Sequence, residues 1–196
     1  MALHWIIALI VLLPMWLLQN YIHELSHGLT LWFGWRWKFK VYPLPSKKLG
    51  RFTWAHVTYE PTTKSREPGP QGWALVSIMP KIVNSVFVSV SAFLSMLFLA
   101  HPIPAVLLSM FAVLNFVDFT VGTSGIFFKK RQTDIWSFQS HMNYSLSAFR
   151  LQAAIMIAVM AIIAGLSLFY EYATTIALST VKMGFIRSLP HLTAII

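Results

Sequence analysis

Four long apolar runs constrain this chain more than any other feature of its sequence. They cover about residues 3–27, 73–100, 105–121 and 146–169, and each is long enough to cross the hydrocarbon core of a bilayer as a helix. With 57% hydrophobic and 11% charged residues, the chain is too apolar for a soluble domain of this size. The sequence therefore predicts one multi-pass membrane domain, residues 1–196, of all-α class with four to five transmembrane helices. The tail, 171–196, is either a fifth span or an interfacial segment.

The segment after the first run has a different period. From Trp35 to Tyr42 apolar and basic residues mostly alternate, and a period of two is typical of a strand. A weaker strand candidate, Arg51 to Tyr59, follows the turn-prone stretch from Ser46 to Gly50. The pair predicts a small membrane-associated β-hairpin at about residues 35–59.

The positions of the basic residues predict how the chain is oriented. Eight of the 15 Lys and Arg lie between the first and second runs, and three more, Lys129 to Arg131, follow the third run. None precedes the first run or lies between the second and third, so both basic loops are expected in the cytoplasm and the N-terminus outside. We therefore expect an integral protein of the plasma (inner) membrane. Because this rule accounts for the net charge of +9, no nucleic-acid partner is expected.

A zinc-hydrolase pattern, His23-Glu24-Leu25-Ser26-His27, ends the first run. On a helix, residues four apart share a face, so His23 and His27 can offer two imidazoles to one metal with Glu24 beside them. The chain has no Cys, so any further protein ligand must be His, Asp or Glu. The competing interpretation is a histidine pair satisfied by backbone carbonyls or lipid headgroups.

A third ligand must come from the same depth, and the chain has only two Asp. Asp118 lies about 14 residues into the third run, roughly 21 Å at the helical rise, at a depth that a tilted helix can match to His23. Asp134 follows Lys129 to Arg131, which prefer water, so it is expected away from the bilayer and kept as an alternative ligand only. Asp118 could instead pair with Lys81 or cap the next turn.

Together these features resemble the site-2 protease family of intramembrane zinc metalloproteases, over about residues 15–121. The resemblance rests on four features: His23-Glu24-Leu25-Ser26-His27-Gly28, the hairpin, Pro80-Lys81-Ile82-Val83-Asn84, and Asn115 with Asp118. It implies a zinc cofactor held by His23, His27 and Asp118, with Glu24 as general base and Asn84 and Asn115 as polar supports near the substrate. The chain departs from the family pattern at Met79 and Phe119, where the family usually has Gly.

The expected function is cleavage of a transmembrane or membrane-proximal segment of a membrane protein near the cytoplasmic face. Such a helix must unwind locally before water can attack, and an edge strand of the hairpin could hold the unwound segment. Without a PDZ-type domain, substrate choice would fall to the helices, the hairpin or an accessory partner protein. Two alternatives stay open. One is an inactive relative that binds or escorts membrane proteins. The other is a di-iron oxygenase, although five of the seven His stand alone.

Overall fold

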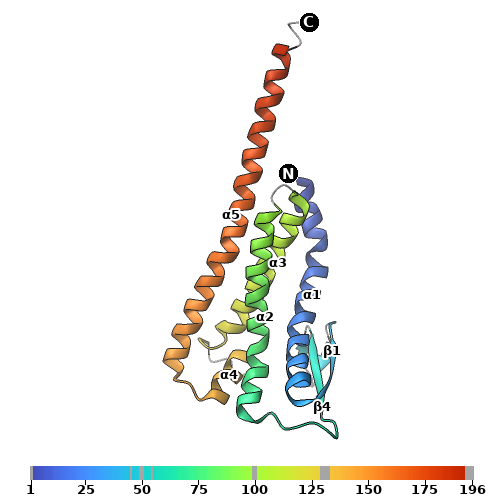
Figure 1. Ribbon diagram of the computed structural model, residues 1–196, viewed down its shortest axis with the longest axis vertical. Coiled ribbons are helices and arrows are strands. Elements are labelled where there is room, and N and C mark those ends of the chain that lie inside the picture. Colours follow the sequence, from blue (N-terminus) through green and yellow to red (C-terminus); the bar gives the residue numbers. More distant parts are fainter. Residues whose placement is uncertain are drawn as a thin grey trace.

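The computed structural model describes residues 2–192 except 45, 49–50, 54, 99–100 and 129–132. In these residues the chain is mostly helical and carries two small pairs of antiparallel strands (Figure 1). The elements, in chain order, are α1 (Ala2–Trp35), β1 (Lys38–Tyr42), β2 (Ser46–Lys48), β3 (Arg51–Thr53), β4 (His56–Glu60), α2 (Gly69–Leu97), α3 (Pro102–Ser124), α4 (Asp134–Met142) and α5 (Leu146–Leu192).

Three helices of the described chain are long and apolar enough to cross a membrane: Gly69–Leu97, Ile103–Ser124 and Leu146–Tyr170. The chain is therefore a membrane protein with transmembrane helices, and these three match the second, third and fourth apolar runs. Small or polar side chains recur every three or four residues on the buried face of α2, which lets neighbouring helices approach closely. These buried residues include Ala74, Ser77, Lys81, Asn84, Ser91 and Ser95, with Val88 at the one intervening position.

The first helix is longer than the sequence predicted. Helix α1 continues through Gly28 and Gly34 to Trp35, so the histidine pair lies inside the helix and the expected end at His27 is wrong. Glycine costs a helix roughly 1 kcal/mol relative to alanine, but tertiary packing can outweigh that preference. Here the ring of Phe39 packs against Gly28, where any side chain would overlap it. The helix ends where Arg36 takes a left-handed conformation, with φ of 59°.

The predicted hairpin is present, with corrected boundaries. Strands β1 and β4 pair antiparallel from Lys38↔Glu60 to Tyr42↔His56, and the pair lies beside the C-terminal half of α1 (Figure 1). The expected single strand from Arg51 to Tyr59 is divided into β3 and β4, and the stretch expected to be only a turn contains β2, which pairs with β3. In β1 the residues alternate between exposed and half-buried, as a strand with one covered face requires.

Two features of the C-terminal part differ from the predictions. Helix α4 occupies part of the loop expected between the third and fourth apolar runs, and Ile135 of its first turn is buried in a cluster with Ile126, Phe149 and Ala153. Helix α5 begins at Leu146 as predicted but continues as one helix to Leu192, beyond the end of the bundle (Figure 1). The described part of the tail is thus a continuation of the last span instead of a separate fifth one. Residues 193–196 lie outside the described residues.

Candidate metal centre

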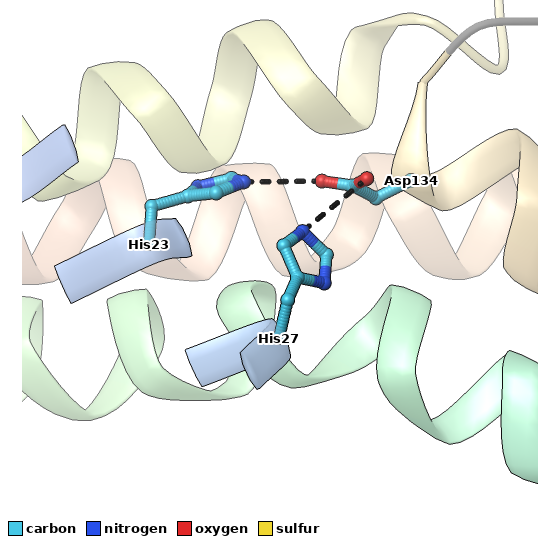
Figure 2. A group of neighbouring side chains, drawn as sticks. All are labelled: His23, His27 and Asp134. Atoms are coloured by element: carbon cyan, nitrogen blue, oxygen red, sulfur yellow. Dashed lines mark hydrogen bonds and ion pairs between the residues drawn. The ribbon is translucent and has the colours of Figure 1, made fainter. Parts of the chain in front are cut away.

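Two imidazoles and one carboxylate converge between α1 and the start of α4 (Figure 2). The Nε2 atom of His23 lies 3.2 Å from one carboxylate oxygen of Asp134, and the Nε2 atom of His27 lies 3.5 Å from the other. One candidate ligand atom from each of the three residues lies within 4.8 Å of the others. Spacing of four on one helix places the two histidines on one face, and α4 supplies the carboxylate from the opposite side.

The second nitrogen of each ring has its own partner. His23 Nδ1 lies 2.8 Å from Asp118 Oδ2, and His27 Nδ1 lies 2.8 Å from the backbone oxygen of Val76 on α2. A carbonyl oxygen only accepts hydrogen bonds, so the Nδ1 of His27 carries the proton; an ionised Asp118 assigns the same tautomer to His23. In neutral rings both Nε2 lone pairs then point at the Asp134 carboxylate. Acceptors facing one another in this way require a cation or additional protons between them.

Three donors from two helices surround the Asp118 carboxylate on α3. Besides His23, the side-chain amide of Asn84 donates to Asp118 Oδ2. The ammonium of Lys81 lies 3.6 Å from the same oxygen and donates to the backbone oxygen of Asp118 at 3.3 Å. The Lys81 side chain is only 3% exposed, so this buried charge depends on Asp118 for compensation. The arrangement fixes Asp118 beside His23 and not between the two histidines.

The position of Asp134 corrects the prediction that it stays away from the histidines. It is the first residue of α4, where the helix dipole favours a carboxylate. The chain can fold back because Gly125 leaves room for Thr133, whose Cγ2 would lie 2.5 Å from a Cβ at that glycine. When the additional protons lie on the two Nε2 atoms, burial still raises the pKa of the Asp134 carboxyl, but hydrogen bonds from His23 and His27 outweigh it and hold that pKa well below the usual range.

Glu24 and Tyr59 lie at the side of this centre that faces the hairpin. Glu24 is half-buried and shares a helix face with Gly28, against which Phe39 packs. Tyr59 of β4 pairs in register with Phe39, so its side chain is on the same face of the hairpin. Burial raises the pKa of the Tyr59 phenol, and the negative charges of Glu24 and Asp134 raise it further. The phenol therefore stays protonated and can donate a hydrogen bond.

The structure brings together most of the residues that the sequence singled out. His23, His27, Asp118 and Asn84 lie in one connected group, with Glu24 beside it. Asn115 is buried, but its amide donates to the Phe111 backbone oxygen one turn earlier in its own helix, at 2.8 Å. The sequence reasoning undervalued Asp134, the partnership of Lys81 with Asp118, and Tyr59. Both Lys81 and Asp134 carried a usable signal: a lone cation inside an apolar run, and the second of only two Asp.

Comparison with known proteins adds no relative. No protein-family model, curated protein or solved structure matches the chain. The resemblance to site-2 proteases therefore rests on the sequence motifs, and the chemistry of the centre on its own residues.

Proposed function

We propose that this chain is an intramembrane zinc metalloendopeptidase in which His23, His27 and Asp134 hold the metal. The observation that carries the proposal is the set of acceptors facing one another: two Nε2 lone pairs and one carboxylate, with both Nδ1 atoms occupied elsewhere. In this assignment Asp134 replaces Asp118 as third ligand. Asp118 becomes the carboxylate that orients His23, and Val76 does the same for His27 through its backbone oxygen, the usual arrangement around zinc-bound histidines.

The donor set fits zinc better than it fits magnesium or calcium. Two imidazole nitrogens and one carboxylate oxygen leave a fourth position open, as in catalytic zinc sites, whereas magnesium and calcium prefer oxygen ligands. When bound there, zinc would polarise a water molecule and the scissile carbonyl group. Glu24 is the residue next to His23 in the chain, and in this proposal its carboxylate accepts the proton of the attacking water.

Tyr59 is proposed to act on the substrate. Its protonated hydroxyl lies on the hairpin face turned to α1, where it could donate a hydrogen bond to the carbonyl oxygen that becomes negative during attack. The neighbouring backbone of β4 offers a strand edge along which an unwound substrate segment can lie extended. The substrate is a transmembrane or membrane-proximal segment of a membrane protein, cut near the cytoplasmic face, with an accessory partner protein or the helices selecting it.

The main alternative is a relative that keeps the fold but does not cleave, and instead binds or escorts membrane proteins. It shares the helices and the hairpin, and it needs neither Glu24 nor the metal. Zinc content and a single isosteric substitution therefore separate the two functions.

The experiment combines both measurements on purified full-length protein. Zinc is measured by elemental analysis, and cleavage of single-span reporter proteins is followed in proteoliposomes. Glu24→Gln should keep about one zinc per chain and lose cleavage, because it removes the proton acceptor and preserves shape. Glu60→Gln, the same change at the exposed end of β4, is the control and should cleave normally. Zinc without cleavage by the native chain would favour the escort function, and a chain without zinc would refute the protease.

A further inference from the structure

A long apolar groove lies between α1 and α2, on a surface that the metal centre does not use. Its volume is about 570 Å³. The side chains that line it are almost all apolar; they include Leu25, Leu29 and Phe33 of α1 and Leu75, Met79 and Val83 of α2. From Ile22 to Phe33 the groove follows twelve residues of α1, which span roughly 16 Å at the helical rise. That length is about half the thickness of a bilayer's hydrocarbon core, and therefore about one leaflet.

A cationic hollow of about 320 Å³ adjoins the groove at the end of α1. The two share Phe33, Gly34 and Trp35, and the hollow adds three cations, Arg36, Lys64 and Arg66. No Asp or Glu is among the described residues that line either one. The groove and the hollow therefore adjoin at these three residues, and together they make a cavity that is apolar along its length and positive at one end.

The backbone around the cationic hollow is held in place by several hydrogen bonds. The amide of Arg66 donates to the backbone oxygen of Trp35 at 3.1 Å, and the indole of Trp37 donates to the backbone oxygen of Arg66 at 2.8 Å. The hydroxyl of Thr62 donates to the backbone oxygen of Arg36 at 3.1 Å. These contacts tie the segment after the hairpin to the end of α1, so the three cations are presented by a fixed framework.

We propose that this cavity is a binding site for one anionic phospholipid. An acyl chain lies in the groove between α1 and α2, and the phosphate lies against Arg36, Lys64 and Arg66. Three properties support this occupant: the length of one leaflet, an apolar lining along a helix that can span the membrane, and positive charge at one end of the groove. Basic pockets beside transmembrane helices on the cytoplasmic side recognise anionic lipids by the same physics. The site is independent of the proposed protease activity.

The test measures lipid retention directly. Protein in detergent is mixed with phosphatidylglycerol or phosphatidylcholine of the same acyl chains, and bound lipid is counted by native mass spectrometry. The native chain should retain one phosphatidylglycerol in preference to phosphatidylcholine. Arg66→Gln should reduce the affinity for phosphatidylglycerol about fivefold, because one cation near a headgroup contributes about that factor, and should leave phosphatidylcholine unchanged. The anchoring bonds of residue 66 use its backbone, so the framework stays intact.

Two further variants separate a built site from general attraction. Lys40→Gln removes the same charge from β1, outside the groove and the cationic hollow, and should have little effect on lipid retention. Leu75→Trp narrows the groove and should reduce retention of both lipids alike. Equal losses in Arg66→Gln and Lys40→Gln would reduce the site to a diffuse basic surface and overturn the proposal. Equal retention of the two lipids would also overturn the proposal. So would a result in which glycerol phosphate alone competes for the site, or in which only an apolar peptide displaces the bound lipid.

Discussion

A pair of isosteric substitutions tests which of the two carboxylates, Asp134 or Asp118, holds the metal. In the proposed centre Asp134→Asn removes a metal ligand, whereas Asp118→Asn removes only the charge that orients His23. The two variants should therefore differ in zinc affinity and, in the opposite sense, in stability. Each substitution preserves side-chain volume, so packing differences contribute little.

The effect of Asp118→Asn on zinc follows from one hydrogen bond. His23 Nδ1 lies 2.8 Å from Asp118 Oδ2, and an asparagine oxygen can still accept there without its charge. Hydrogen bonds to a charged group are worth about 1 to 1.5 kcal/mol more than hydrogen bonds between neutral groups. Losing that difference at His23 corresponds to roughly a tenfold weaker zinc affinity. This agrees with the 10- to 100-fold losses that follow removal of partners of metal-bound histidines. Asp134→Asn should exceed that range and leave zinc substoichiometric.

For stability the order of the two variants is reversed, and Asp118→Asn should be the less stable. Asp118→Asn leaves the Lys81 ammonium, 3% exposed, without its counter-charge, and uncompensated buried charges cost about 3 to 5 kcal/mol. Asp134 is 32% exposed, and its removal leaves both Lys81 and His23 paired with Asp118, so in the zinc-free state Asp134→Asn should cost less stability than Asp118→Asn. Adding Lys81→Met to Asp118→Asn should recover most of the lost stability, because it removes the stranded charge.

Zinc affinity is measured by competition with a chromogenic chelator, and stability by the temperature at which the chain stops eluting as a monodisperse peak. Stoichiometric zinc in Asp134→Asn, together with its loss in Asp118→Asn, would refute the assignment and restore Asp118 as the ligand. Equal behaviour of both variants would show that the two carboxylates do not have separate roles.

Three further predictions test the surroundings of the centre. Tyr59→Phe should lower kcat about 100-fold with little change in KM, as expected for a donor to a developing oxyanion. The control Tyr42→Phe, at a residue stacked with His56, should leave kcat unchanged. A higher KM with unchanged kcat in Tyr59→Phe would make Tyr59 a binding residue. Gly28→Val should displace the Phe39 ring and with it the hairpin, lowering cleavage while zinc remains bound; unchanged cleavage would show that the hairpin is dispensable. Gly125→Val should displace Thr133 and the first turn of α4, so that zinc content falls in a soluble, folded chain; full zinc content would indicate that Asp134 does not hold the metal.

Much of the fold follows from local sequence patterns. Apolar runs predict spanning helices because a membrane requires every backbone polar group to be satisfied within the helix. Three runs correspond to helices that meet the length and hydropathy of a span, and the alternation from Trp35 to Tyr42 corresponds to β1 of the hairpin. The end of α1 was misplaced because Gly28, normally a sign of a helix end, serves here as the surface on which Phe39 packs.

The sequence by itself determined that His23 and His27 share a helix face, since spacing of four and the helical period fix that geometry. It also limited the candidate ligands, because the chain has no Cys and only two Asp. Only the tertiary structure decided which carboxylate faces the two Nε2 atoms. Depth along a span argued for Asp118, but the choice depends on a turn at Gly125 and on burial of Ile135, which bring Asp134 back to the histidines. Contacts between residues 111 positions apart arise from packing, and no local pattern records them.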